Sequence, residues 1–203
     1  MSGVFISFEG IDGAGKSTHI ARLHQHLLAQ GREVCLSREP GGTPLGESIR
    51  EWVLQQPLAN ITEVLLMFAA RAEHLERVIR PALAAGKVVL CDRFTDATMA
   101  YQGAGRGVDA ALLRLLAEQV EAGTRPVLTV LFDVPPAVSR QRLAGLKTPD
   151  RFEREQAAFF ERVRQAYLDM ALAEPQRFAV LDASQPLDAV TAALLRVVEA
   201  RLP

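Results

Sequence analysis

Apolar and polar positions along this chain repeat with two different periods. Five short runs are mostly apolar and rich in β-branched residues, which predicts strands at 4–8, 33–36, 87–91, 127–133 and 177–181. Between these runs, apolar residues recur every three or four positions, which is typical of helices. Strands that alternate with helices predict an α/β fold, in which a five-stranded parallel sheet carries helices on both faces.

The helical pattern also contains start and stop signals. Asn60 or Thr62 is expected to cap a helix that continues to residue 79, and Pro81 is expected to end or kink it. Asp109 is expected to cap the helix that follows the third strand.

The most informative stretch lies between the first predicted strand and the first predicted helix. It contains Gly-x-x-x-x-Gly-Lys-Ser in the strand-to-helix context that a phosphate-binding loop requires. Glycines let several backbone N–H groups point inward, and the helix start adds the positive end of its dipole. Lys16 is expected to reach the β- and γ-phosphates, and the Ser17 hydroxyl to ligate Mg²⁺. The predicted nucleoside triphosphate site consists of Gly10, Ile11, Asp12, Gly13, Ala14, Gly15, Lys16, Ser17 and Thr18.

Charged residues follow two other predicted strands. Ligands of parallel α/β sheets lie beyond the carboxyl ends of the strands, where Arg38 follows the second run and Asp92 and Arg93 follow the third. An acidic residue that faces a phosphate-binding loop suits a Mg²⁺ site, although a helix N-cap is the alternative role for Asp92. With Arg50 on the next helix, these arginines predict a second anion site and hence a phosphorylated acceptor.

A basic segment near residue 140 is broken by glycine and proline. Taken alone, it is typical of a solvated helix face with charge pairs. Beside a triphosphate site, a mobile lid at about 140–154 that brings arginine onto the transferring phosphate is the better interpretation.

Composition limits the remaining possibilities. The chain has 203 residues and a net charge of −1, which fits one domain over 1–203 and does not favour a nucleic-acid partner. It contains neither an apolar run of membrane-spanning length nor a secretory signal, so we expect a cytoplasmic protein without a membrane partner. A GTPase or regulatory ATPase is the rival class, but the guanine-reading motif Asn-Lys-x-Asp is absent from the sequence.

Five motifs together resemble those of bacterial thymidylate kinases. They lie at residues 8–18, 38–43, 68–71, 92–94 and 100–103, in the order of that family, and the similarity covers essentially the whole chain. The resemblance implies a three-layer P-loop NTPase fold and transfer of the γ-phosphoryl group of Mg·ATP to dTMP, which gives dTDP. It also implies a cytoplasmic homodimer.

The resemblance assigns roles at the phosphate end of the acceptor. Asp12 resembles the carboxylate near the 3′-hydroxyl, and Asp92 resembles the acidic residue near Mg²⁺. Arg93 resembles the arginine that holds the dTMP phosphate, with Arg38 and Arg50 as candidates to assist it.

At the base end, Arg71 and Gln102 resemble the residues that read thymine through its carbonyl and N3 edge. Tyr101 resembles the ring beneath the sugar, where a ribose 2′-hydroxyl would collide with it. Thr98 is a weaker candidate for contact with the base.

The sequence departs from the family pattern where a phenylalanine often stacks on the base. In this chain that position is Met67, and the phenylalanine is the next residue, Phe68. Positions three and four residues before Arg71 both share its helix face, so either side chain is a candidate to cover the base. The role of Glu9 in the first motif stays open. Whether the pocket also accepts dUMP as a substrate stays open as well.

The lid departs as well. Many relatives with a similar loop carry three alternating arginines, whereas this chain has Arg140, Arg142 and then Ala144. Lys147 or Arg151 is a candidate for the missing cation, and the residue that acts on the transferring phosphate stays open among these four.

Overall fold

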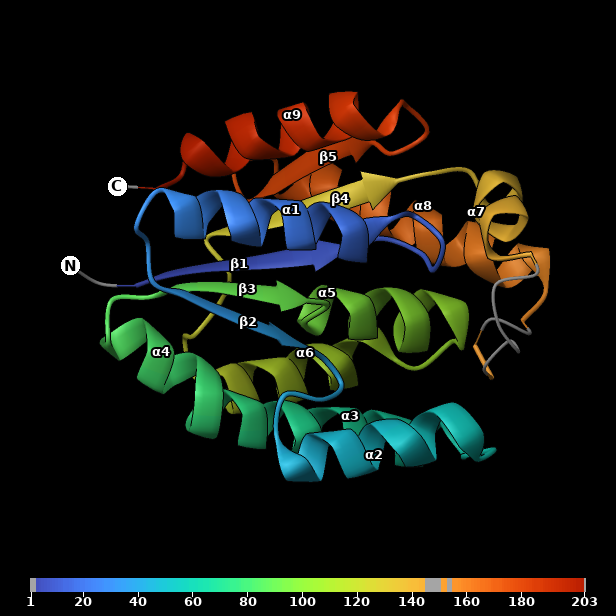
Figure 1. The fold of residues 1–203 in the computed structure, drawn as a ribbon. Helices are drawn as coiled ribbons and strands as arrows, with labels where there is room; N and C mark the ends of the chain where they lie inside the picture. Colours follow the sequence, from blue (N-terminus) through green and yellow to red (C-terminus); the bar gives the residue numbers. More distant parts are fainter. Residues whose placement is uncertain (1–2, 145–150, 153–154, 203) are drawn as a thin grey trace.

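The five apolar runs form the strands of one sheet in the computed structural model, which describes residues 3–144, 151–152 and 155–202 (Figure 1). All pairings are parallel, and the order β2-β3-β1-β4-β5 places the first strand at the centre. The strands are β1 (Val4–Glu9), β2 (Val34–Arg38), β3 (Val88–Asp92), β4 (Leu128–Asp133) and β5 (Phe178–Asp182). The prediction of a five-stranded parallel sheet is confirmed, with strand ends shifted by one or two residues.

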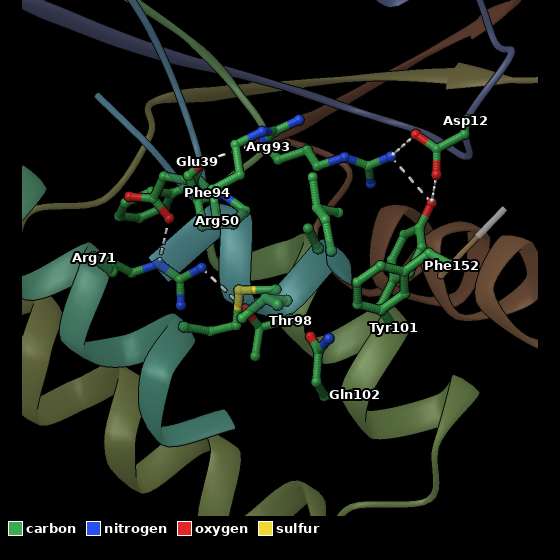
Figure 2. A pocket seen from close by; sticks show the side chains of 15 residues that line it. Asp12, Glu39, Arg50, Arg71, Arg93, Phe94, Thr98, Tyr101, Gln102 and Phe152 are labelled. Atoms are coloured by element: carbon green, nitrogen blue, oxygen red, sulfur yellow. Dashed lines mark hydrogen bonds and ion pairs between the residues drawn. The ribbon is translucent and has the colours of Figure 1, made fainter. Parts of the chain in front are cut away.

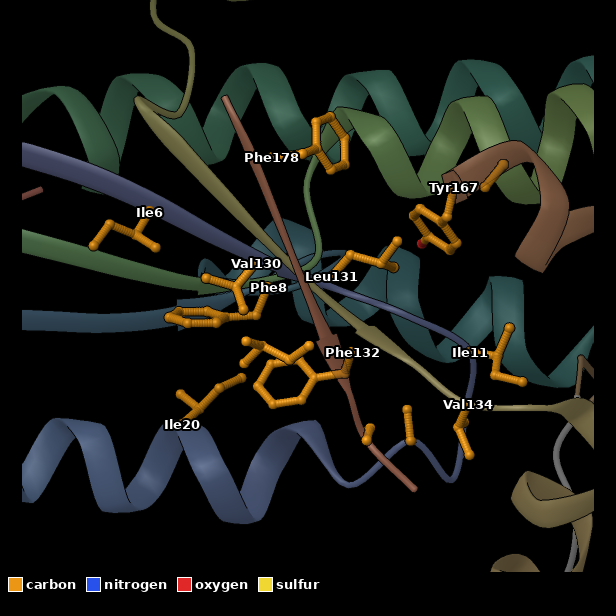
Figure 3. Close-up of a cluster of buried hydrophobic side chains, with 14 of the residues drawn as sticks. Ile6, Phe8, Ile11, Ile20, Val130, Leu131, Phe132, Val134, Tyr167 and Phe178 are labelled. Atoms are coloured by element: carbon orange, nitrogen blue, oxygen red, sulfur yellow. The ribbon is translucent and has the colours of Figure 1, made fainter. Parts of the chain in front are cut away.

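Helices cover both faces of this sheet. They are α1 (Lys16–Ala29), α2 (Pro44–Gln55), α3 (Asn60–His74), η1 (Leu75–Ile79), α4 (Arg80–Ala84), α5 (Thr95–Thr98), η2 (Met99–Gly105), α6 (Ala110–Glu121), α7 (Pro136–Leu143), α8 (Ala157–Ala173) and α9 (Leu187–Glu199). α1 and α9 pack together on one face, whereas α3, α6, η2 and α8 lie on the other (Figures 1 and 3). None of the helices in the described ranges is both long enough and apolar enough to cross a membrane.

The core fixes the strand and helix on either side of the phosphate-binding motif. Phe8, Phe132 and Ile20 lie between the sheet and α1, whereas Leu131 and Tyr167 lie on the opposite face (Figure 3). Consecutive residues of β4 therefore point to opposite faces, as the pleat of a strand requires. Burial of each such side chain stabilises the fold by about 1.5–3 kcal/mol, so β1 and α1 hold the loop between them firmly.

The long helix after α2 differs from its prediction. Pro81 does not end this helix. It lies in the first turn of α4, and the π-helical turn η1 leads directly from α3 into α4. Proline lacks an N–H donor and crowds the preceding turn, and a widened turn accommodates both defects. The predicted cap is also wrong, since Ala59 occupies the cap position and Asn60 donates through Nδ2 to the carbonyl oxygen of Arg106. The Asp109 cap is confirmed by its 3.0 Å bond from the Ala111 N–H.

Residues 95–105 form helical structure that the sequence did not predict. α5 leads into the π-helical segment η2, which packs against α8. A Cβ atom on Gly105 would lie 2.6 Å from the ring of Phe159, so only glycine allows this close approach. The widened segment carries Tyr101 and Gln102 to the carboxyl edge of the sheet.

Candidate active site

The phosphate-binding motif forms a tight loop between β1 and α1. Its glycines have positive φ angles of 135° at Gly10, 76° at Gly13 and 87° at Gly15, a backbone region that other residues rarely adopt. A Cβ atom on Gly10 would also lie 2.5 Å from the carbonyl oxygen of Phe132. α1 begins at Lys16 without a capping side chain from the described residues. The N–H groups of its first turn are therefore available to an anion.

The Lys16 side chain lies across this loop. Its Nζ donates to the carbonyl oxygens of Gly10 (3.1 Å) and Ile11 (3.4 Å), and the residue is almost fully buried. Burial and then the charge of Arg93 lower the pKa of Lys16, while Asp92 opposes this shift. Ammonium groups bind phosphate oxygens more strongly than neutral carbonyl oxygens, so a bound triphosphate would draw Lys16 away from the loop carbonyls.

Two cavities meet at the carboxyl edge of the sheet. The loop cavity is lined by Asp12, Gly13, Gly15, Lys16, Ser17, Thr18, Arg38, Glu39, Arg50, Asp92, Arg93 and Leu143. The arginine pocket is lined by Asp12, Glu39, Pro40, Arg50, Val53, Leu54, Met67, Arg71, Arg93, Phe94, Ala97, Thr98, Tyr101, Gln102 and Phe152 (Figure 2). Asp12, Glu39, Arg50 and Arg93 line both cavities, so a charged boundary joins the two.

The loop cavity contains a candidate cation position. Asp92 and Ser17 both line it, and Asp92 Oδ1 is buried without a hydrogen-bond partner among the described residues. Asp92 does not cap the next helix, because α5 begins only at Thr95. The described part of the chain holds no cluster of three or more His, Cys, Asp or Glu residues suited to a metal. These oxygens therefore fit Mg²⁺ that takes most of its ligands from phosphates and water.

Arg71 is fixed at one end of the arginine pocket (Figure 2). Its Nε donates to Glu39 Oε2 at 2.7 Å, and its Nη2 donates to Thr98 Oγ1 at 2.9 Å. Its guanidinium carbon lies 4.9 Å from the ring centre of Phe68 and 5.2 Å from that of Phe94. Nη1 is buried and has no hydrogen-bond partner within the described ranges. The arginine thus keeps one donor for a ligand while the others hold it in place.

The two candidates for stacking occupy different environments. Met67 lines the arginine pocket. Phe68 is buried in a separate apolar cluster with Val64 and Leu113, where it supports the Arg71 guanidinium. The geometry therefore places Met67, and not Phe68, where a ligand could contact it.

Gln102 lines the same pocket as Arg71 and is almost fully buried. Its Nε2 donates to Glu63 Oε1 at 2.7 Å. Glu63 is fully buried and also pairs with Arg106 and Arg151. Because the amide nitrogen is held by Glu63, Gln102 offers its carbonyl oxygen to the pocket as an acceptor.

Arg93 occupies the opposite end of the pocket, beside the phosphate-binding loop. Its Nη2 donates to Asp12 Oδ1 at 2.8 Å and to the Tyr101 hydroxyl at 3.1 Å, and its guanidinium lies 4.7 Å from the Tyr101 ring centre. The Tyr101 hydroxyl donates in turn to Asp12 Oδ2. Burial opposes both charges, yet Tyr101 and Asp12 hold the pKa of Arg93 well above its usual value, and Arg93 and Lys16 lower the pKa of Asp12.

The backbone at Arg93 is strained. Its φ angle of 71° is uncommon for a residue other than glycine. The Arg93 N–H donates to the carbonyl oxygen of Phe8, and the following N–H of Phe94 donates to Glu9 Oε1 at 2.7 Å. Glu9 also accepts a bond from the Tyr167 hydroxyl. Burial and the nearby Asp96 raise the pKa of Glu9 to about 8.

The other two predicted arginines differ in exposure. Arg50 lies on the boundary between the cavities and donates to the carbonyl oxygen of Pro40. Burial and then the charges of Arg38 and Arg93 lower its pKa. Arg38 is more exposed and pairs with Glu47 at 2.8 Å. Arg38, Arg50 and Arg93 all line the loop cavity, where their charges repel each other, so a bound phosphate would relieve this repulsion.

Comparison with known proteins shows to which family the chain belongs. The family model described as thymidylate kinase matches residues 8–194. Thymidylate kinases from Polaromonas sp. and Alcanivorax borkumensis are 52% and 55% identical to the chain. These alignments cover 99% and 98% of the chain, and 98% and 97% of the relatives. The chain belongs to the thymidylate kinase family.

A solved structure supports the same family and the fold. Thymidylate kinase from Ehrlichia chaffeensis superposes with a TM-score of 0.79 at 34% identity, over 98% of this chain and 99% of that one. Members of the family are kinases, so the protein is a phosphotransferase with ATP as the phosphate donor. The three-layer fold and the family that the motifs implied are both confirmed.

Of the four candidate lid cations, the three that the structure describes occupy different places. Arg142 donates to the carbonyl oxygen of Ala183 at 2.9 Å and lies 3.5 Å from that of Gly13 in the phosphate-binding loop. Arg151 pairs with Glu63 and donates to the carbonyl oxygen of Val53. Arg140 is exposed, and Lys147 lies outside the described residues.

Three acids that hold side chains of the candidate site were missed or left without a role by sequence reasoning. Glu39 orients Arg71, Glu63 orients Gln102, and Glu9 supports the strained turn at Arg93. Glu39 and Glu9 stand within recognised motifs, which is a usable signal. Glu63 lies eight positions before Arg71 without any local pattern that marks it.

Proposed function

We propose that the protein transfers the γ-phosphoryl group of ATP to dTMP, giving dTDP and ADP for dTTP synthesis. The observation that carries this proposal is the boundary formed by Asp12, Arg50 and Arg93, where a phosphate-binding loop meets a second pocket. The loop cavity would hold ATP and the arginine pocket would hold dTMP, so that the two phosphate ends face each other across this boundary.

The donor triphosphate would lie against the loop from Gly10 to Thr18. Backbone N–H groups and the α1 N-terminus would hold its oxygens, and Lys16 would exchange its loop carbonyls for the β- and γ-phosphates. Ser17 and Asp92 would hold Mg²⁺, which neutralises phosphate charge when bound. The buried, unsatisfied Oδ1 of Asp92 supports this assignment.

The base of dTMP would lie between Arg71 and Gln102. The Nη1 donor of Arg71 suits the 4-carbonyl oxygen of thymine, and the Gln102 oxygen suits the N3–H group. Met67 would cover the base, and Thr98 would act through Arg71, to which it is hydrogen-bonded. One methyl group is worth only about 1–3 kcal/mol in a pocket, so dUMP is the expected competitor.

The sugar and phosphate would occupy the Arg93 end. Tyr101 lines this part of the pocket, where a ribose 2′-hydroxyl would crowd its ring. The phosphate would bind Arg93, assisted by Arg50 and Arg38, which leaves the Asp12 carboxylate to accept the 3′-hydroxyl. Neutralising both anions lets the acceptor oxygen attack in line, with no covalent enzyme intermediate.

Two lid arginines would contribute to catalysis from different sides. Arg142 already contacts the loop at Gly13 and would move onto the transferring phosphate. Arg151 would act through the Glu63 side of the arginine pocket. Closure of the segment at about 140–154 would exclude water that otherwise hydrolyses ATP. We further propose one nucleoside monophosphate kinase domain over 1–203 that works as a cytoplasmic homodimer, without a nucleic-acid partner.

A coupled ADP-release assay tests the reaction and its acceptor. Mg·ATP would be offered with dTMP, dUMP, dCMP, AMP, GMP or thymidine. We expect turnover with dTMP far above that with the others. If no acceptor increases ADP release while ATP still binds, that result would contradict the proposal and favour a nucleotide sensor.

A further inference from the structure

The acid that holds Arg71 is itself held by a buried chain of polar groups. Glu39 Oε1 lies 2.9 Å from His74 Nδ1, and His74 Nε2 lies 2.6 Å from the Ser37 hydroxyl oxygen. His74 is fully buried and Glu39 nearly so. The chain Ser37–His74–Glu39–Arg71 therefore joins β2 to α3 behind the base end of the arginine pocket.

The order of serine, histidine and acid resembles the triad of acyl-transfer enzymes, but here the acid also holds an arginine. A Cβ atom on Gly42 would lie 2.5 Å from the Ser37 hydroxyl oxygen and 2.6 Å from His74 Nε2. The Gly42 backbone therefore packs closely against both groups. The chain points inward, toward Arg71.

The hydrogen bonds fix which group each atom donates to. An ionised Glu39 only accepts, so it takes one bond from Arg71 Nε and one from His74 Nδ1–H. In the neutral imidazole, His74 Nε2 is then the acceptor for the Ser37 hydroxyl. With both Glu39 oxygens occupied, the guanidinium plane of Arg71 has one orientation, and Thr98 fixes its second edge.

From this arrangement we propose that Glu39, held by His74 and Ser37, is a specificity-determining positioning residue for the base. It keeps the Nη1–H donor of Arg71 directed at the pocket, where it accepts a pyrimidine with a 4-carbonyl group and rejects one with a 4-amino group. Cytosine presents a donor at that position, and two donors that face each other in a buried site leave both unpaired. This inference rests on the proposed base site.

The test compares dTMP with dCMP as acceptors for three variants along the chain. In Glu39→Gln, the amide keeps the shape but loses the charge that holds Arg71. We expect its kcat/KM for dTMP to fall at least tenfold, mostly through KM, and its preference for dTMP over dCMP to fall at least tenfold. His74→Gln and then Ser37→Ala should show smaller losses, because each lies one hydrogen bond further from Arg71.

Matched controls separate positioning from general damage. Glu73→Gln changes a more exposed acid of α3 that pairs with Arg77, and His26→Gln changes a histidine on α1 that pairs with Glu199. Both should retain the selectivity of the unmodified protein. The KM for ATP should stay within about twofold in Glu39→Gln. A folded Glu39→Gln protein with unchanged dTMP selectivity overturns the inference, even if its thermal stability has fallen.

A measurement on the unmodified protein covers the case in which Glu39→Gln does not fold. The ¹⁵N resonances of the four histidines report which ring nitrogen carries a proton, and His74 is assigned by its absence from His74→Gln or by its shift in Ser37→Ala. A proton on Nδ1 supports the chain. An Nδ1 without a proton cannot hold the Glu39 carboxylate, which contradicts the inference. Weak turnover of dTMP by the unmodified protein instead contradicts the proposed function, so the two failures differ.

Discussion

The two ends of the arginine pocket are built in opposite ways. At the base end, Glu39 and Thr98 hold Arg71 through its Nε and Nη2 groups, and the buried Nη1 group stays available to a ligand. At the phosphate end, Arg93 Nη2 donates to Asp12 and to the Tyr101 hydroxyl, so the charge of this arginine is already paired within the protein. Arg71 is therefore preorganised for the base. Arg93 is instead paired with Asp12, a carboxylate that takes the place of the phosphate until substrate binds.

This difference matches what each end has to do. A site that distinguishes one base from another gains selectivity from rigid donors, because a non-cognate base then leaves polar groups unpaired. A phosphate site gains from a carboxylate that occupies the arginine until substrate arrives, because an unpaired buried cation is costly. Asp12 then becomes free to accept a hydroxyl group at the moment when the phosphate binds. The following changes test this contrast, from the largest expected effect to the smallest.

Lys16→Ala removes a charge from the phosphate side only. Loss of one electrostatic contact with a transferring group typically lowers the rate about 10²–10³-fold, and we expect at least this loss in kcat with little change in the KM for dTMP. Steady-state kinetics with circular dichroism would show a folded but slow enzyme. Near-normal turnover would contradict the assignment of the loop.

Arg71→Ala removes the preorganised donor at the base end. A charge-assisted hydrogen bond is worth about 1.5–3 kcal/mol, so we expect the KM for dTMP to rise about ten- to a hundredfold. The kcat at saturating dTMP should change much less than in Lys16→Ala. If the KM for ATP rises instead, Arg71 belongs to the donor side and the contrast between the two ends fails.

Sequence alone was sufficient where contacts are local. The loop glycines, Lys16 and the strand pattern follow from neighbours within a few residues, and the structure places them as expected. Arg71 and Gln102, although 31 positions apart, were found only through the family motifs. Their supports could not be predicted, because Glu39 meets His74 and Glu63 meets Gln102 through tertiary packing. The π-helical turns could not be predicted either, because their period differs from the 3.6 residues of the α-helical pattern.

Tyr101 lies between the two ends and tests where sugar selectivity arises. Tyr101→Phe keeps the ring and should change the ratio of dTMP to ribothymidine monophosphate turnover by less than about threefold, since only hydrogen bonds to Asp12 and Arg93 are lost. Tyr101→Ala removes the ring and should raise relative use of the ribonucleotide. Unchanged selectivity in Tyr101→Ala would exclude the steric role.

The smallest expected effect concerns the acid that supports the phosphate end. Glu9 accepts bonds from a backbone N–H and a tyrosine hydroxyl, whereas Glu39 at the base end accepts from arginine and histidine. Burial and then Asp96 raise the pKa of Glu9 from 4.5 to about 8. The folded state therefore binds this proton more tightly than the unfolded state does, and the free energy of unfolding should fall as pH rises from about 4.5 to 8.

Glu9→Gln removes that titration while keeping the shape of the side chain. Relative to the unmodified protein, its free energy of unfolding should rise across the same pH range, with a slope of at most about 1.4 kcal/mol per pH unit. Urea unfolding at pH 5, 7 and 9 measures the difference, with the more exposed Glu73→Gln as a control that should follow the unmodified protein. A difference that does not vary with pH would mean that Glu9 is ionised throughout. Both ends of the pocket would then be supported by ionised carboxylates, Glu9 and Glu39. The two ends would differ only in the groups that pair with Arg71 and Arg93.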